Sequence, residues 1–485
     1  MNIFSLVKSA LKNKIFWYLI SRYFVLGLQF LTSIYLAVKL GAYYFGIWSF
    51  IILLINIGAS CNWGIGNAAT ILLVQNKEDQ LKSQDYIFNS FLLTFFISII
   101  PLGFLLFDRI FGIALFDKYH LDNKIYAVVF LIVSSYLSGL LMNISRVKNR
   151  IWEITIAQLI WPTAMFSILF FATDKQLLFL LLIAYAVSSI VAIGIYLLNR
   201  QISFNGHFSV SLLKEIFVKG FFLFLYNAGF TFIVLSTKAI VSKYYPVEEF
   251  GYFSFAFSLA NGILLLLDSL IFIVFHKMID LLRGNDKEKI AQNLKMLRHN
   301  YLYMLHFLFY TVLAASGFFV TFFPQYSKSY NSFILIISAL VMYSNCFGYN
   351  TYLLAQNKEK VMALFVGLAL LCNITIALLA VNILHCKFSH VILATFFTYG
   401  LYSLAVNCYA MRVAGLKRNF KALIHSNTTL KLLPLYLGTT LLVLAQIDKK
   451  YFVLPLVVFV LLNIIELKNI LKNIPVFLKE KKINI

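Results

Sequence analysis

The chain has 485 residues, of which 61% are hydrophobic and 12% are charged, and its mean hydropathy is +0.84. Soluble domains are about 45–50% apolar and about 25% charged, so this composition excludes a water-soluble globular protein and indicates a polytopic membrane protein. The formal net charge of +22 comes from lysines and arginines in short gaps between apolar runs. That distribution is typical of membrane loops, and we expect no nucleic-acid partner because no basic surface is gathered on a soluble domain.

Fourteen apolar runs are candidates for membrane-spanning helices, each of which needs about 20 residues to cross a bilayer. The last two runs are short, and only residues 447–450 separate them. The fold class predicted is therefore an all-α polytopic membrane protein with about 14 transmembrane helices. We expect the spans near residues 15–38, 45–74, 87–107, 125–145, 153–173, 177–198, 220–240, 251–275, 300–323, 332–353, 361–382, 389–411, 432–447 and 451–467.

The basic residues predict the orientation of the chain. With the N-terminus in the cytoplasm, the inside segments hold 29 of the 41 lysines and arginines, and the outside loops hold 11. Because cytoplasmic loops carry the excess of Lys and Arg, both termini are expected inside. The remaining basic residue, Arg22, lies within the first predicted span.

The loops leave no room for a soluble catalytic domain, because the longest of them, residues 276–299, has about two dozen residues. The sequence contains no GxxxxGK[ST] motif, no HExxH motif and no CxxC pair. These motifs would indicate nucleotide binding, a zinc protease site and a metal or redox site, respectively. We therefore expect no enzyme activity, no cofactor and no metal site. A membrane-embedded transferase or polymerase remains the alternative from a different functional class.

An internal repeat relates the two halves of the chain. Residues 45–50 (FGIWSF) correspond to residues 250–255 (FGYFSF) at an offset of 205, and Asn56 corresponds to Asn261. A weaker similarity pairs residues 148–150 with 356–358. The copies begin spans two and eight, so the halves have the same orientation, as in transporters built from parallel repeats. A chance match is the alternative interpretation.

This repeat predicts two six-helix lobes, at residues 1–200 and 201–412, followed by a terminal helix pair at 413–485. Gly41, Gly46 and Gly251 lie where the repeated segments begin. We interpret them as structural residues, which allow tight turns and close helix contacts.

The sequence resembles those of a known family. The resemblance rests on a basic amphipathic N-terminus, on the segment Leu40–Trp48 (LGAYYFGIW), on its recurrence at Val247–Tyr252 (VEEFGY) and on the span count. These features are similar to those of the polysaccharide (O-antigen) flippases of the multidrug/oligosaccharidyl-lipid/polysaccharide exporter superfamily. The resemblance implies a bacterial inner-membrane protein, and an undecaprenyl-pyrophosphate-linked oligosaccharide as its substrate. It also implies alternating access between two lobes.

Two charges lie at membrane depth, where each costs at least about 2.5–3.5 kcal/mol on insertion scales. Arg22 lies about seven residues into the first span, and Asp268 lies inside the apolar run of span eight. We predict that Arg22 binds the diphosphate and that the two residues form a gate or an ion-coupling pair across the cavity. The alternatives are a snorkelling arginine, a static bond of Asp268 within its own lobe, and proton or sodium coupling.

Further candidate substrate-binding residues are Lys238, Asn56, Asn62 and Asn261. Lys238 ends span seven, where it either attracts the headgroup or snorkels to the interface. Asn56, Ser60 and Asn67 are spaced to share one face of span two, next to Asn62 and Trp63. Amides beside an aromatic ring suit a sugar-containing substrate, although such groups also bond helices to each other.

The leading function is therefore a lipid-linked oligosaccharide flippase for O-antigen or another surface polysaccharide. The expected partners are the lipid-linked oligosaccharide and membrane lipids. H⁺ or Na⁺ is a candidate coupling ion, and a polysaccharide polymerase is a candidate contact. The alternatives are a cation-coupled multidrug exporter of the same superfamily and a flippase of the lipid-linked cell-wall precursor.

Overall fold

The computed structural model describes residues 14–111, 116–121, 124–171, 174–198, 205–282, 287–416 and 432–479. Every regular element in these residues is helical. A bilayer core offers no water to backbone N–H and C=O groups, so an apolar chain satisfies them within helices. The helices of the first half are α2 (Lys14–Ser60), α3 (Ile65–Gln75), α4 (Gln80–Phe111), η1 (Asp117–Tyr119), α5 (Lys124–Val147), α6 (Ile151–Phe171), α7 (Asp174–Leu197), α8 (Val210–Tyr244) and α9 (Val247–Leu282).

The regular elements described in the second half are also helices, and α17 and α18 are the last two long ones. Its elements are α10 (Lys287–Ala315), α11 (Gly317–Phe322), η2 (Pro324–Ser329), α12 (Tyr330–Ser344), α13 (Tyr349–Ala355), α14 (Glu359–Asn382), η3 (Phe388–His390), α15 (Ile392–Val413), α17 (Leu433–Leu444), η4 (Lys449–Phe452) and α18 (Val453–Lys479).

The expectation of an all-α polytopic membrane protein is confirmed, and each predicted span lies largely on helix. Within the described residues, eight helical segments are long and apolar enough to cross a membrane. The number is nine if the bent pair of helices Pro324–Ser344 and Tyr349–Ala355 is one span. The count of fourteen therefore stays a prediction.

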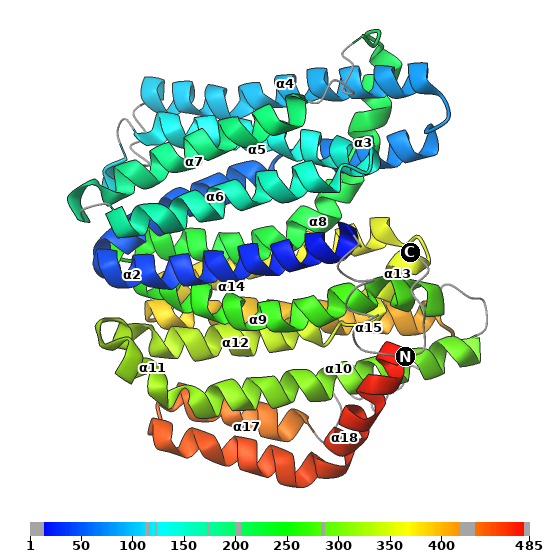
Figure 1. Ribbon diagram of the computed structural model, residues 1–485. Helices are drawn as coiled ribbons and strands as arrows, with labels where there is room; N and C mark the ends of the chain where they lie inside the picture. The colour runs from blue at the N-terminus through cyan, green and yellow to red at the C-terminus, as the bar shows by residue number, and fades with distance from the viewer. Residues whose placement is uncertain are drawn as a thin grey trace, which may run out of the picture. The chain divides into compact units, whose positions relative to one another are not determined.

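The chain divides into two compact units, and the division falls between Ser258 and Leu259, inside α9. In the first unit α6 packs on α7 and α2, and α5 packs on α7, α3 and α4, as Figure 1 shows. Helix α8 also belongs to this unit, because it packs on α3, α4 and α2. The lobes predicted at 1–200 and 201–412 rest on the sequence repeat, and they stay a prediction.

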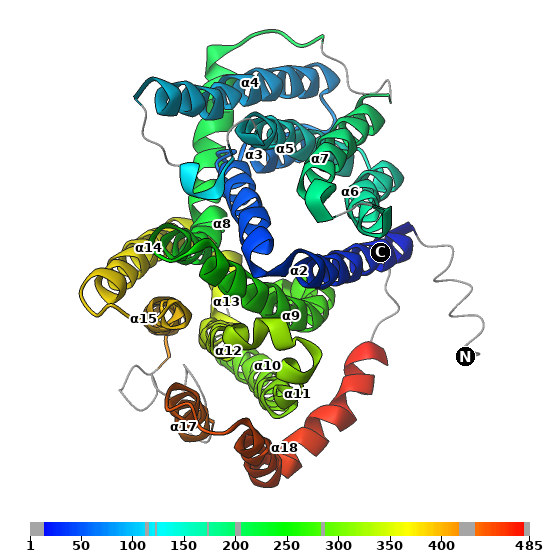
Figure 2. The same cartoon turned by 90° about the vertical axis from the view of Figure 1, so that its left-hand side faces the viewer.

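In the second unit α15 packs between α12 and α14, and α10 packs on α12. The last two helices lie together along this unit (Figure 2). Helix α17 packs on α12 and α18 packs on α10. The hydroxyl of Tyr436 on α17 donates to the carbonyl oxygen of Ser338 on α12 at 2.7 Å, which ties the terminal pair to this unit.

The long helix α2 contains the first predicted turn. Gly41 has φ 70° and ψ 172° inside it, so two helices meet at a kink there. This conformation is open to glycine and costly for residues with a Cβ. The kink separates the predicted spans 15–38 and 45–74, which confirms the interpretation of Gly41 as a turn residue.

The weaker sequence similarity between the halves has a structural counterpart. Asn149 and Asn357 are both left-handed, with φ 56° and 54°, and each lies two residues beyond the end of a helix. The next residue closes the turn in the same way: Arg150 N–H donates to Ser145 O at 2.9 Å, and Lys358 N–H donates to Leu353 O at 3.0 Å. Asparagine tolerates this conformation better than most residues. The two loops thus share one helix C-terminal motif.

Candidate functional site

The first unit contains a second break, between α2 and α3. Residues Cys61–Gly64 leave the helix, with Trp63 at φ 53° and Gly64 at φ 70°. The backbone of α8 explains why glycine stands at position 64. A Cβ on Gly64 would overlap the carbonyl oxygen of Gly220, and a Cβ on Gly220 would lie 2.9 Å from Trp63 O. The break therefore packs directly on the α8 backbone.

The side chain of Trp63, within the break, also packs on α8. Its ring centroid lies 5.3 Å from that of Phe217 and 5.9 Å from that of Phe221, both on α8. Such aromatic pairs add about 0.5–1.5 kcal/mol each to the burial of their area. The side chain of Trp63 is thus occupied by packing on α8 in this structure.

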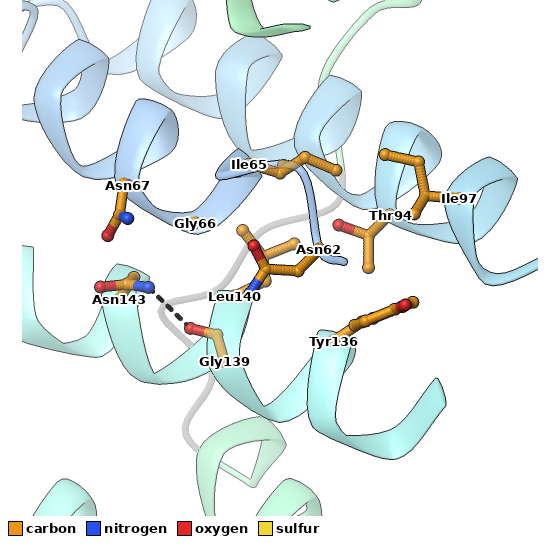
Figure 3. Close-up of a pocket in the computed structure, with 10 residues that line it drawn as sticks. All are labelled: Asn62, Ile65, Gly66, Asn67, Thr94, Ile97, Tyr136, Gly139, Leu140 and Asn143. Carbon is orange, nitrogen blue, oxygen red and sulfur yellow. Dashed lines mark hydrogen bonds between the residues drawn. The ribbon is translucent and has the colours of Figure 1, made fainter. Parts of the chain in front are cut away.

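A small polar pocket lies on the other side of the break, between α3, α4 and α5. Figure 3 shows the side chains that surround it. Its volume is about 50 Å³. Four of the polar groups come from three segments: Asn62 from the break, Thr94 from α4, and Tyr136 and Asn143 from α5. The lining residues are Asn62, Ile65, Gly66, Asn67, Thr94, Ile97, Tyr136, Gly139, Leu140 and Asn143.

Hydrogen bonds hold the polar groups of this pocket in place. Thr94 Oγ1 donates to Ser90 O at 2.8 Å, and Tyr136 Oη donates to Gly58 O at 2.7 Å. Asn143 Nδ2 donates to Gly139 O at 2.9 Å, a bond drawn in Figure 3. The side chains of Thr94 and Tyr136 belong to residues only 5% exposed, so their orientations are set by packing as well.

The structure brings together part of the polar set predicted on span two. Asn62 and Asn67 line the pocket, and both are exposed. The prediction that Asn56, Ser60 and Asn67 share one helical face is wrong. The break at 61–64 interrupts the helix, so α2 ends at Ser60 and Asn67 belongs to α3. Asn56 is exposed on α2 and does not line this pocket.

The other candidates lie elsewhere. Asn261 is exposed on α9, in the second unit. Lys238 is half-buried on α8, and its Nζ lies 5.2 Å from the ring centroid of Phe257 on α9. A contact of this kind contributes about 0.5–2 kcal/mol, depending on desolvation. The side chains of Arg22 and Asp268 lie outside the description, so their pairing stays a prediction.

Three pocket residues were not singled out from the sequence: Thr94, Tyr136 and Asn143. Each is an ordinary polar residue in an apolar run, and only the packing of α4 and α5 against α3 brings them together. Gly66 shows how tight this packing is, because a Cβ there would lie 2.5 Å from Asn143 Nδ2. Among the described residues, no group of three or more His, Cys, Asp or Glu side chains could hold a metal ion.

The repeated glycines form a reciprocal contact within the first unit. A Cβ on Gly46 would overlap the carbonyl oxygen of Val247, and a Cβ on Gly251 would overlap that of Ala42. Gly46 and Gly251 are 205 residues apart, and so are Ala42 and Val247. The two contacts are therefore exchanged by the repeat, as around a pseudo-two-fold axis. This arrangement confirms the interpretation of these glycines as close-contact residues.

A clamp on α8 lies at the end of the bundle predicted to face outside. Lys118 Nζ donates to Ser242 O at 2.6 Å, to Tyr245 O at 2.5 Å and to Lys243 O at 3.2 Å. Tyr119 Oη donates to Ser242 O at 2.9 Å. These carbonyls lie at the C-terminus of α8, where a cation is also favoured by the helix dipole. We refer to Lys118 and Tyr119 with these carbonyls as the α8 clamp.

We expect Lys118→Met to loosen the α8 clamp. The charged hydrogen bonds of Lys118 are partly exposed, so their loss should cost about 1 kcal/mol. The fraction of molecules in which the α8 clamp is open should then rise about fivefold. The measurement is the rate at which a membrane-impermeant maleimide labels a Ser242→Cys reporter, with the five native cysteines replaced. Lys124→Met is the matched control, because among the described residues Lys124 Nζ bonds only the exposed His120 O, at 3.3 Å. Equal labelling rates in the two variants would contradict the clamp.

A buried arginine holds a broken helix in the second unit. Arg298 on α10 is 6% exposed, and its Nη1 donates to Asn345 O at 2.8 Å and to Phe347 O at 2.5 Å. Its guanidinium lies 4.5 Å from the ring centroid of Tyr349, where α13 begins. Arg298 thus bonds carbonyls in the break between α12 and α13, which the interrupted helix leaves without their usual donors.

Comparisons with known proteins agree with this architecture. The fold is similar to that of "Lipid II flippase MurJ, inward closed conformation", with a TM-score of 0.63, 15% identity, and 92% of this chain and 97% of that chain covered. It is also similar to an inward-facing multidrug resistance MATE family transporter of the MOP superfamily, with a TM-score of 0.62, 11% identity, and 83% and 96% coverage. An outward-facing MATE structure gives a TM-score of 0.55, 12% identity, and 85% and 97% coverage.

The sequence comparisons identify the family. No curated protein matches the sequence. Residues 11–275, which are more than half of the chain, match the family described as polysaccharide biosynthesis protein. The predicted resemblance to polysaccharide flippases is thereby confirmed at the level of family and superfamily, and the chain belongs to the polysaccharide biosynthesis protein family, with the fold of the MOP-superfamily transporters.

Proposed function

We propose that the protein flips undecaprenyl-pyrophosphate-linked oligosaccharide units from the cytoplasmic to the periplasmic leaflet of a bacterial inner membrane. The observation that supports the proposal is that the chain belongs to the polysaccharide biosynthesis protein family, and the regular elements of its described residues are all helices. Family and fold are those of transporters and flippases, and no covalent chemistry is proposed. The product would serve the synthesis of O-antigen or another surface polysaccharide.

The mechanism proposed is alternating access between two lobes. The α8 clamp and the reciprocal glycine contacts join the start of the repeated second half to α2 and η1. If the basic residues set the orientation as predicted, these contacts lie at the periplasmic end. Opening them would let the headgroup leave, while the lipid tail stays in the bilayer. A repeat with both copies in the same orientation suits such a motion.

Both termini are proposed to be cytoplasmic, as the excess of Lys and Arg in alternate loops favours. The proposed partners are the lipid-linked oligosaccharide, membrane lipids, and H⁺ or Na⁺ as the coupling ion. A polysaccharide polymerase would receive the flipped product on the periplasmic side. The residues proposed for the diphosphate are Arg22 and Lys238, because their charges match phosphate oxygens.

Deletion of the gene tests the proposal. We expect the lipid-linked oligosaccharide to accumulate at least tenfold in the cytoplasmic leaflet, because its synthesis continues while its exit is blocked. The measurement is protection of the glycolipid from a periplasmic glycosidase in intact spheroplasts. Re-expression of the gene should restore its exposure. An unchanged glycolipid distribution would contradict the proposal.

The same strain separates the two alternatives. A multidrug exporter would leave the glycolipid unchanged and lower the resistance of cells to cationic dyes. This alternative is kept because the fold matches the inward-facing MATE transporter and MurJ almost equally, with TM-scores of 0.62 and 0.63. A flippase of the cell-wall precursor would instead arrest peptidoglycan synthesis on depletion.

A further inference from the structure

We infer that the polar pocket between α3, α4 and α5 binds a monovalent cation, of the class of Na⁺ or K⁺. The pocket is the one lined by Asn62, Thr94, Tyr136 and Asn143. Ion binding there is inferred only from the geometry of the pocket. The further inference that this ion is the coupling ion rests on the proposed function.

The hydrogen bonds of the pocket decide the sign of charge that it can accept. Thr94 and Tyr136 each have one hydroxyl proton, and both protons are donated to backbone carbonyls. Their oxygens therefore offer lone pairs alone to an occupant of the pocket. Asn143 likewise commits one amide hydrogen to Gly139 O, and its Oδ1 is an acceptor. The amides of Asn62, Asn67 and Asn143 also carry N–H donors, so the two buried hydroxyl oxygens decide the charge, and they suit a cation and disfavour an anion such as a phosphate.

The lining also decides the charge and size of the cation. None of the ten residues that line the pocket carries a carboxyl group. Divalent ions such as Ca²⁺ and Mg²⁺ are generally bound with carboxylates, whereas monovalent ions are held by neutral oxygens. The volume of about 50 Å³ has room for a dehydrated ion and a few water molecules, since one water needs about 10–15 Å³ of such volume. It is too small for a sugar ring.

The oxygens are held in position before an ion arrives. Thr94 and Tyr136 are buried, and the lack of a side chain on Gly66 leaves space for the amide of Asn143. Preorganised ligands lower the entropy cost of binding. Asn62 and Asn67 are exposed, so they provide a side through which an ion can reach the buried oxygens.

Ion binding would act on the break between α2 and α3. Asn62 Oδ1 accepts from Gly64 N–H at 2.9 Å, so the amide that lines the pocket also stabilises the turn. The next residue, Trp63, packs on Phe217 and Phe221 of α8. An ion held by Asn62 together with α4 and α5 would therefore stabilise the conformation in which the break packs on α8.

Thermal unfolding of the purified full-length protein in detergent tests the site. NaCl and KCl are titrated against choline chloride at constant ionic strength. We expect a saturable rise in Tm for at least one of the two ions, because binding to the folded state alone stabilises it. Thr94→Val removes the hydroxyl oxygen and is expected to raise the apparent Kd at least tenfold. Thr94→Ser keeps the oxygen and is expected to retain binding.

Thr155→Val is the matched control. Thr155 on α6 is also 5% exposed, and its hydroxyl makes the same bond to the carbonyl four residues earlier, Ile151 O, at 2.8 Å. It does not line the pocket. The wild-type ion response should survive this substitution. The site is overturned if the wild type shows no ion-specific shift, or if Thr94→Val responds as Thr155→Val does.

The outcomes for site and function can be told apart. A protein that flips its glycolipid but shows no ion-specific shift overturns the site and leaves the proposed function. A protein that shows the shift while its deletion leaves the glycolipid unchanged overturns the function and leaves the site.

Discussion

Replacement of Gly251 by alanine is expected to destabilise the protein by about 3 kcal/mol or more. The added Cβ would overlap the carbonyl oxygen of Ala42, and it would lie 3.2 Å from Gly46 N. These are backbone atoms, which can move only if α2 or α9 shifts as a whole, so the clash exceeds ordinary overpacking of about 1–3 kcal/mol. The measurement is thermal unfolding of the detergent-solubilised protein, followed by size-exclusion chromatography.

Two further substitutions make this prediction specific. Gly46→Ala should behave like Gly251→Ala, because its Cβ would overlap Val247 O in the reciprocal contact. Gly194→Ala on α7 is the control, because a Cβ there meets nothing within 4 Å. In a helix interior that change should stabilise by about 0.5–1 kcal/mol. If all three alanine variants unfold alike, the close contact of α2 and α9 is wrong.

Replacement of Arg298 by alanine is expected to cost about 3 kcal/mol. The change removes a charged donor from Phe347 O and from Asn345 O, which keeps only its weaker bond from Asn407 Nδ2 at 3.2 Å, and a carbonyl left unpaired in a buried site costs about 1–3 kcal/mol. We expect the segment between α12 and α13 to become accessible. Hydrogen exchange of the Asn345–Tyr349 amides in the purified protein measures this directly.

Arg298→Lys is expected to recover only part of the loss, since an ammonium can donate to the carbonyls that Nη1 contacts but has no planar guanidinium to lie over the ring of Tyr349. Arg412→Ala is the control in the same unit. Arg412 is exposed in the last turn of α15, and its loss should change stability by no more than about 0.5 kcal/mol. Exchange rates for Arg298→Ala that match those of Arg412→Ala would refute the role of Arg298 at the break.

The candidate site was only partly predictable from the chain. Asn62 and Asn67 were visible as amides in an apolar run next to glycines. Their shared face with Asn56 was inferred from an unbroken helix, and the structure breaks that helix at residues 61–64. The break depends on the approach of Gly220 in α8, which lies more than 150 residues further along the chain. No local pattern carries that information.

The sequence by itself determined that this is a helical multi-pass membrane protein and placed helix at every predicted span. A continuous run of about twenty apolar residues can satisfy its backbone within itself only as a helix, so local composition suffices for that conclusion. The sequence also contained the internal repeat. Its duplicated glycines, Gly46 and Gly251, lie where the backbones of α2 and α9 touch, so a side chain there would not fit. Only the tertiary structure decided where helices break and which polar groups meet. Thr94, Tyr136 and Asn143 form a pocket because α3, α4 and α5 pack together, and such contacts between distant segments follow from shape rather than from periodicity.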